Sequence, residues 1–234
     1  MNFASEKPLV FIATVKSTKD PMGLGRVQVE LKDLDKPVEM PWIRMIHFHA
    51  SKEFGAMILP EVGDMVAVLR GASDRLGSMF ILGYIYDKTN KPAIKDDDGK
   101  NNIKQFQTRS KHIIEISDEK GKEKISVTTG KGASIVMDDE NEKITITVKG
   151  LSIDMDGKGK AITITSDGDL IIDAKKIDVK GADGISMEGK EFKVKTDAAL
   201  ELKAGAAGKF ETGAALDLKG GAPVSIKGPA VNIG

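Results

Sequence analysis

The sequence contains no cysteine and carries no net charge, and each absence excludes a class of protein. Without cysteine, neither disulfide bonds nor thiolate metal sites are available to the fold. Thirty-five basic residues balance thirty-five acidic ones. Because neither sign is in excess, we do not expect the phosphate backbone of a nucleic acid or an anionic membrane surface as the main partner.

Long apolar runs and aromatic residues are also scarce. The apolar run at residues 9–15 is far shorter than the roughly 18 residues that a transmembrane helix requires. Its composition favours a β-strand over a signal-peptide core, and no small-residue cleavage site follows it. Aromatic residues make up 5% of the chain and are concentrated in its first half. Because aromatics normally supply bulk to a core, the second half must build its interior from aliphatic and small side chains.

The first half consists of short strand-like runs separated by turn signals, with no helical stretch. Residues 27–31 alternate strictly between apolar and polar side chains, as a half-buried strand does. Residues 60–64 combine proline, glycine and aspartate in a turn. The strand-like runs are residues 9–16, 25–31, 42–48, 65–70 and 79–86. Several short strands at this spacing predict a small all-β barrel of OB type, which we assign to residues 1–90.

Residues 91–110 and 111–234 differ from this pattern and from each other. The first of these segments is charged, rich in turn residues and poor in apolar ones, which predicts a solvated connector too short for a catalytic domain. The second segment is a repeat of apolar–polar–apolar pairs that recur about every eight residues. Examples of the pairs are Ile125/Val127, Ile144/Ile146, Ile162/Ile164, Leu170/Ile172, Ile177/Val179, Leu200/Leu202, Leu216/Leu218 and Val231/Ile233.

Fixed-period similarity of this kind predicts a solenoid or a fibre. Period-2 alternation places the apolar residues of each pair inside and the polar residues between them outside. Two geometries accommodate the same eight-residue repeat, which we call an octad. One is a single-chain parallel β-helix with three octads per coil. The other is an intertwined trimer in which each chain contributes one strand per layer. At a strand spacing of about 4.8 Å, the octads span roughly 20 Å in the first geometry and on the order of 60 Å in the second. The repeat alone leaves both geometries open.

Several segments of the first half together resemble the OB domain of the spike proteins of contractile injection machines, which include phage baseplate spikes and the VgrG proteins of type VI secretion. The segments that carry the resemblance are residues 25–29, 42–44, 55–66, 71–75 and 81–86, in the same order and at similar spacing. The octad repeat is similar to the triple-stranded β-helix of the same proteins. The resemblance favours the trimer over the single-chain coil, with the triple-stranded β-helix at residues 111–234.

The resemblance implies a function that is mechanical and not enzymatic. A homotrimeric needle would stand at the end of the inner tail tube and puncture the target cell envelope when the sheath contracts. It would be made in the cytoplasm and become part of a virion-like or extracellular, secreted injection particle. The target membrane would be contacted mechanically, and effector cargo could be carried.

The resemblance also implies two protein partners. The chain begins almost at the barrel, so a separate hub or baseplate protein is expected at the OB end. The C-terminus lacks the His-x-His iron site with which some phage spikes end, so a PAAR-like tip protein is expected there. We expect Val231, Asn232, Ile233 and Gly234 to bind it. Small residues after position 203 further predict that the shaft becomes slender before a flat end.

Few residues offer an alternative chemistry. His47 and His49 would project from one strand face, a spacing compatible with a metal ion, but no third ligand lies nearby in the sequence and we expect none to bind. The acidic runs at residues 96–98 and 138–140 stand in turn-like contexts, whereas glycoside hydrolysis requires one carboxyl group with a raised pKa. We therefore expect no catalytic residues and no cofactor. The alternative function is a carbohydrate-binding or carbohydrate-cleaving β-helix protein, such as an adhesin or a polysaccharide depolymerase.

Overall fold

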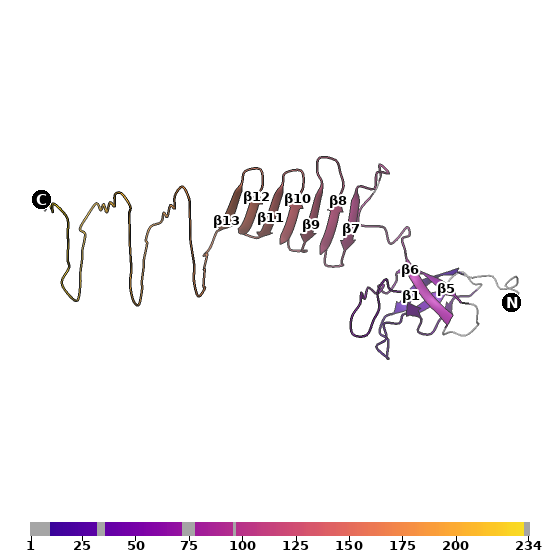
Figure 1. Ribbon diagram of the computed structural model, residues 1–234. Coiled ribbons are helices and arrows are strands. Elements are labelled where there is room, and N and C mark those ends of the chain that lie inside the picture. Colours follow the sequence, from indigo (N-terminus) through magenta and orange to yellow (C-terminus); the bar gives the residue numbers. More distant parts are fainter. Residues whose placement is uncertain (1–9, 32–35, 72–77, 96, 232–234) are drawn as a thin grey trace. The chain divides into compact units, whose positions relative to one another are not determined.

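The computed structural model describes residues 10–31, 36–71, 78–95 and 97–231. Within these residues the chain is all-β, with two sheets and no α-helix. Figure 1 shows the first sheet in the N-terminal part of the chain and the second in the middle, followed by an extended trace. The all-β prediction is therefore confirmed. No helix in the described residues is long and apolar enough to cross a membrane.

The N-terminal sheet has six strands in the order β3-β2-β1-β5-β6-β4. All neighbours are antiparallel except β4 and β6, which run parallel. A bridge between Val27 and Ile43 connects the residue before β2 with the residue before β4. Because β2 and β4 lie near opposite ends of the strand order, this bridge closes the sheet into a small barrel. The strands are β1 (Val10–Ser17), β2 (Gln28–Leu31), β3 (Val38–Glu39), β4 (Arg44–Met45), β5 (Met65–Arg70) and β6 (Met79–Ile85).

Alternate residues of these strands form the interior of the barrel. Val66 and Val68 of β5 are fully buried, while their neighbours along the strand are only partly buried. This is the period-2 pattern of a sheet with one face toward a core. The buried core residues are Ala13, Val15, Val27, Val29, Leu31, Met40, Ile43, Val66, Val68 and Ile81. The core consists of aliphatic side chains, and the barrel has a complete interior of its own.

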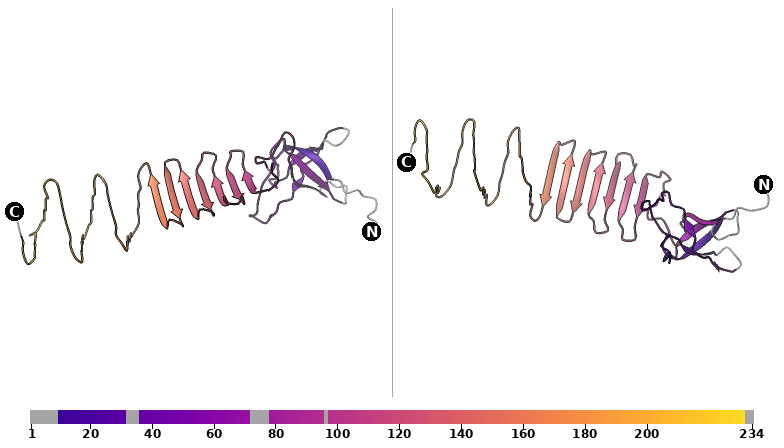
Figure 2. Two further views of the ribbon diagram at one scale, coloured as in Figure 1. Left: turned by 90° about the horizontal axis from the view of Figure 1, so that it is seen from above. Right: turned by 60° about the horizontal axis from the view of Figure 1, so that its bottom comes forward.

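The second sheet, which we call the shaft sheet, is a meander of seven antiparallel strands in sequence order. Both views in Figure 2 show the strands following one another with short connections. The strands are β7 (Ile103–Gln107), β8 (Ile113–Ser117), β9 (Lys124–Thr128), β10 (Ser134–Asp138), β11 (Lys143–Val148), β12 (Leu151–Asp156) and β13 (Ala161–Ser166). Strand β7 lies within residues 91–110, so the segment predicted as a connector contains the first strand of the sheet.

The register of the shaft sheet aligns the apolar residues of every strand. Ile135 of β10, for example, is opposite Val127 of β9 and Ile146 of β11. Two columns of side chains therefore run along one face of the sheet. One column is Phe106, Ile114, Val127, Ile135, Ile146, Ile153 and Ile164; the other is Lys104, Ile116, Ile125, Met137, Ile144, Met155 and Ile162. We call this face the apolar face.

Residues 173–231 belong to a second compact unit and contain no strand. The backbone is extended and bends about every eight residues, at positions 175, 182–183, 190, 197–198, 205–206, 213–214, 221–222 and 229. The bends coincide with the turn positions of the octad repeat. Every described residue of this unit is exposed. The predicted triple-stranded β-helix is not shown by this single chain, and it stays a prediction.

Candidate functional site

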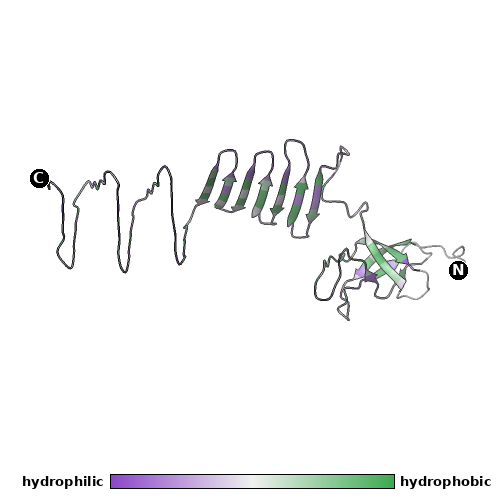
Figure 3. Cartoon of the chain, in the orientation of Figure 1, coloured by the Kyte–Doolittle hydropathy of each residue, from purple (hydrophilic) through white to green (hydrophobic). Residues whose placement is uncertain are grey.

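Among the described residues, many side chains on the apolar face of the shaft sheet are left exposed by the rest of the chain. Eleven side chains of the two columns are between 37 and 72% exposed, and so are Val148 and Leu151, which lie opposite each other on the same face, so that thirteen apolar side chains are exposed. Figure 3 shows the alternation of hydrophobic and hydrophilic residues along each strand. Soluble proteins rarely leave a contiguous apolar surface of this extent uncovered. The face is therefore a candidate interface.

The opposite face of the same sheet is polar and satisfies its own charges. Asp154 accepts a hydrogen bond of 2.9 Å from the Thr145 hydroxyl and pairs with Lys143 at 3.1 Å. These interactions, the Thr145 hydrogen bond first, lower the pKa of Asp154 below its ordinary value. Gln105 donates to Glu115 across β7 and β8 at 2.9 Å. Since the polar face has partners within one chain, it is suited to face solvent, and the apolar face is the one that needs covering.

The turns of the shaft sheet hold the acidic run at residues 138–140. Asp138 accepts hydrogen bonds from the backbone and the side chain of Asn141, at 2.8 and 2.9 Å. The side-chain bond, followed by the backbone bond, lowers the pKa of Asp138. A catalytic acid needs the opposite shift. Asp138 is therefore a turn cap that stays ionised.

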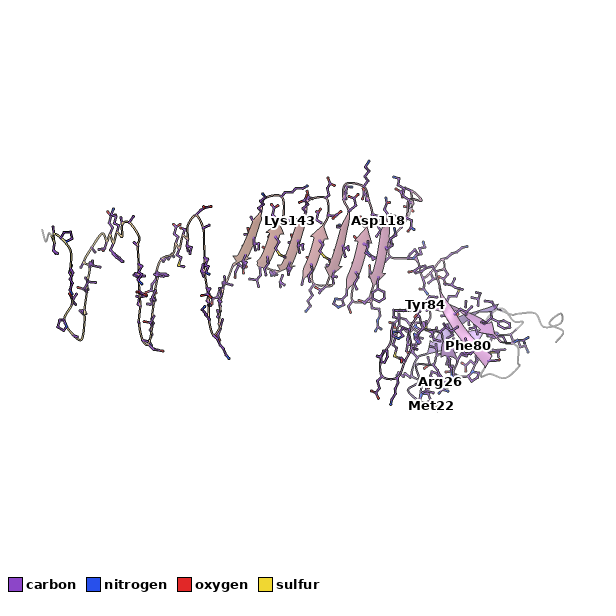
Figure 4. The ribbon with its side chains drawn as sticks, viewed as in Figure 1. Met22, Arg26, Phe80, Tyr84, Asp118 and Lys143 are labelled. Atoms are coloured by element: carbon purple, nitrogen blue, oxygen red, sulfur yellow. The ribbon has the colours of Figure 1, made fainter. Side chains whose placement is uncertain are left out.

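Salt bridges also tie the turns to the strands, as between Lys104 and Asp118 at 2.6 Å. Asp118 and Lys143 are labelled on this sheet in Figure 4.

A buried carboxylate organises the loop between β1 and β2 of the barrel. Asp20 accepts backbone hydrogen bonds from Met22, Leu24 and Arg26, and its two oxygens also bind the Arg26 guanidinium at 3.0 and 2.6 Å. The Arg26 hydrogen bond is the main cause that holds the pKa of Asp20 well below its usual range. The loop exposes Met22 and Leu24 to solvent, and Met22 and Arg26 are labelled in Figure 4.

This arrangement is not among the features predicted from the sequence. The only local signal for it is Asp20 followed by Pro21 and Gly23, which is typical of a turn.

The two histidines singled out in the sequence lie on a loop of the barrel. His47 and His49 line an open groove of about 530 Å³ together with Phe54 and Met57. The rings of His49 and Phe54 meet edge to face with centroids 5.5 Å apart. No group of three potential metal-ligating residues occurs in the described residues. The structure thus gives His49 an aromatic packing partner.

Tyr84 anchors the segment that carries the histidines. Its hydroxyl donates a hydrogen bond to the backbone carbonyl of Ile58 and lies 3.8 Å from the sulfur of Met45. Burial raises the pKa of Tyr84, with a smaller contribution from Asp64. Met45 and Ile58 flank the loop on either side, so the tyrosine holds both of its ends.

The expected tip-binding residues are only partly within the structure. Val231 is 50% exposed. Asn232, Ile233 and Gly234 lie outside the described residues. The prediction that these four residues bind a tip protein therefore stays a prediction.

Comparison with known proteins bears on the barrel. Residues 11–86 match the family model of the type VI secretion system/phage-baseplate injector OB domain. The match covers all of the closed sheet except Val10, its first residue, so the N-terminal domain is OB-like, as predicted. A search of curated proteins gave no match. The barrel therefore indicates a role in a contractile injection system. Such a component would be part of a virion-like or secreted injection particle.

Proposed function

We propose that this protein is the central spike of a contractile injection machine, a homotrimeric needle that punctures the envelope of the target cell. The observation that carries the proposal is the combination of an injector-type OB barrel with a shaft that one chain leaves incomplete. The barrel has a closed core. The shaft sheet has an apolar face without a partner, and residues 173–231 have the octad pattern without strand pairing.

The free energy available from burying the apolar face is large enough to offset the cost of binding a partner. Burial of a large apolar side chain contributes roughly 1.5–3 kcal/mol. Because the thirteen side chains are roughly half exposed in the single chain, about half of this free energy remains to be gained at each of them on association. The apolar face would therefore contribute on the order of 10 kcal/mol per chain, which is comparable to the cost of association of about 4–15 kcal/mol.

The periodicity of the apolar face supports an identical partner. The two columns continue from strand to strand across the meander. A surface that repeats at each strand spacing is complemented along its full length by another surface with the same repeat. Three such sheets around one axis would enclose an aliphatic interior. The resemblance of the repeat to the shaft of VgrG and phage spike proteins supports the number three.

Mechanical function follows from such a trimer. Continuous backbone hydrogen bonding around an aliphatic interior gives a rigid rod, and interlocked chains separate slowly. We propose that the OB end attaches to a hub or baseplate protein below the tail tube, and that a PAAR-like protein at the other end forms the tip. In this arrangement the chain transmits force and needs no catalytic group.

The test is the oligomeric state of the purified chain. A homotrimer has three times the chain mass of 25.1 kDa, about 75 kDa. We expect this species in sedimentation equilibrium at micromolar concentration and on detergent gels of unheated samples. A monomer in sedimentation equilibrium would refute the proposal. Release of soluble sugars from polysaccharide or peptidoglycan by that monomer would instead support the carbohydrate-active alternative.

A further inference from the structure

The turns of the shaft sheet form two rows, one along each long side of the sheet, because the chain reverses direction after every strand (Figure 1). The first turn row comprises residues 108–112, 129–133, 149–150 and, after β13, 167–169; the second comprises residues 118–123, 139–142 and 157–160. The length of a strand, about 17–20 Å for five or six residues, separates the two rows. Asp118 and Lys143, labelled in Figure 4, both lie at the second row.

The first turn row is basic along most of its length and acidic after β13. The turns at residues 108–112, 129–133 and 149–150 contain no carboxylate. Each has an exposed lysine that forms no ion pair within the described part of the chain; these are Lys111, Lys131 and Lys149. Beyond β13 the sign reverses, since Asp167 and Asp169 are exposed with only a glycine between them.

The second turn row has the opposite distribution of charge. The turn at residues 118–123 has three carboxylates and two lysines, and Glu119 pairs with Lys122 inside it at 2.7 Å. The turn at residues 139–142 has three exposed carboxylates and no base, and the turn at residues 157–160 has two exposed lysines and no carboxylate. The exposed charges of these last two turns are Asp139, Glu140, Glu142, Lys158 and Lys160; none of them forms an ion pair with another described residue.

The two rows of one sheet are therefore complementary in charge along their whole length. Both change sign toward β13, in opposite directions. Three sheets that turn their apolar faces toward one axis place the first row of each sheet beside the second row of the next. The turns of the two rows are offset by one strand, about 4.8 Å, so each turn of one row fits between two turns of the other.

We propose that the first turn row of each shaft sheet binds the second turn row of another copy, so that ion pairs between turns fix the order and the register of the copies. The proposal rests on the homotrimer put forward above and names the surfaces that join its sheets. Different surfaces of one chain that meet in this way make a head-to-tail contact, which closes into a ring. A two-fold contact would instead place the acidic turn at residues 139–142 near its own copy, and like charges repel.

The change of sign is what specifies the register. The apolar face repeats at every strand, so copies shifted by two strands would still bury most of the same apolar area. A shift in one direction brings Asp167 and Asp169 beside the acidic turn at residues 139–142. A shift in the other direction brings the lysines of residues 157–160 beside Lys149. Both wrong registers are therefore disfavoured by like charges, which is how specificity against close alternatives is commonly achieved.

Carbodiimide cross-linking of the trimer tests the contact, because it joins a lysine to a carboxylate only where the two side chains touch. The two turn rows of one sheet are too far apart for such a bond within a chain. Mass spectrometry of proteolytic fragments identifies the joined residues. We expect Lys131 or Lys149 joined to Asp139, Glu140 or Glu142, and Lys158 or Lys160 joined to Asp167 or Asp169.

Reversal of charge gives a second measurement. One version of the chain carries Lys131→Glu and Lys149→Glu, another carries Asp139→Lys and Glu140→Lys, and a third carries all four changes. In low salt we expect each of the first two to lower the melting temperature of the trimer by on the order of 5 °C. The third should recover most of the loss, because its two rows are again opposite in sign.

The matched control is Lys88→Glu with Lys91→Glu, which changes the net charge by the same amount at exposed positions outside the shaft sheet. It should melt like the natural chain. In 1 M salt the Debye length is about 3 Å, so the differences among the versions should largely disappear.

The outcomes separate this inference from the proposed function. A trimer without cross-links between the two rows, whose charge-reversed versions melt like the control, would overturn the contact and leave the trimeric spike intact. If Lys131→Glu with Lys149→Glu left the trimer unchanged but abolished binding to vesicles of anionic lipid, the first row would instead belong to a membrane surface, which also overturns the contact. A monomer would overturn both proposals.

Discussion

Replacement of Ile144 by aspartate tests the assignment of the shaft interior. Ile144 lies in the middle of the apolar face, opposite Met137 and Met155, and is 37% exposed in the single chain. In the proposed trimer, three copies of the new carboxylate would lie near one axis without water. A carboxylate in such a place becomes protonated rather than staying charged, so its pKa is raised.

The loss of trimer stability can be calculated from the free energy of protonating each new carboxylate. One pH unit corresponds to 1.36 kcal/mol and an ordinary aspartate has a pKa of about 3.9, so neutralisation at pH 7 costs about 4 kcal/mol per chain. Three chains would lose roughly 13 kcal/mol, as much as the whole stability of a typical domain. Because the pKa is raised in the assembled state, the penalty is present at neutral pH and decreases as the pH falls. At pH 5 it is about 1.5 kcal/mol per chain.

Sedimentation equilibrium at pH 7 and pH 5 is the assay. We expect Ile144→Asp to be monomeric at pH 7 with an intact barrel, and to recover trimer at pH 5. Ile144→Asn removes the same packing without a titrating group, so its effect should not depend on pH.

The matched control is Thr147→Asp, in the same strand but on the polar face, opposite Ser134 and Ser152. It should remain trimeric at both pH values. Equal trimer yields for Ile144→Asp and Thr147→Asp at pH 7 would refute the assignment of the two faces.

Two further predictions concern the barrel and the turns. Asp20→Asn should lower the melting temperature at pH 7. Because the pKa of Asp20 is lowered in the folded state, its contribution is present above about pH 4 and is lost below it. The difference from the natural chain should therefore shrink as the pH falls from 5 to 2 in circular dichroism melts, and a constant difference would contradict this reasoning. Gly130→Ala should destabilise the shaft sheet by roughly 1–3 kcal/mol, because a Cβ at Gly130 would collide with the backbone carbonyl of Ser110. Gly168→Ala, where the nearest atom is the Ser166 hydroxyl at 3.9 Å, should cost less in urea denaturation, and equal losses would argue against the collision.

Much of the fold could be predicted because period-2 patterning is a local property of the sequence. The runs at residues 65–70 and 79–86 correspond to β5 and β6, and the alternation around Ile144 and Ile146 gives the correct face of β11. The direction of pairing could not be predicted, because an octad fits a parallel coil and an antiparallel meander equally well. Whether neighbouring strands pair parallel or antiparallel depends on whether the chain turns back after each strand.

The features that were missed depend on contacts that composition does not reveal. Strand β7 follows a charged, turn-rich segment and has only two strongly apolar residues, Ile103 and Phe106, so its sequence resembles a connector. It becomes a strand because β8 offers an edge with which it pairs in register. Asp20 likewise gains its role from Arg26, which lies beyond the turn that it caps. In both cases tertiary or loop geometry outweighs local propensity.

The division of the shaft at Ser166 has a consequence for assembly. Strands β7 to β13 pair only with sequence neighbours, and such local contacts form quickly. Residues 173–231 show no strand within one chain, so in the proposed trimer they can order only after association. We therefore expect refolding in two phases: amide protection in β8 to β12 that is independent of concentration, then protection of residues 173–231 whose rate rises with concentration. In the proposed trimer, residues 173–231 would order from their N-terminal toward their C-terminal end, since each new layer of strands requires the previous layer as its edge.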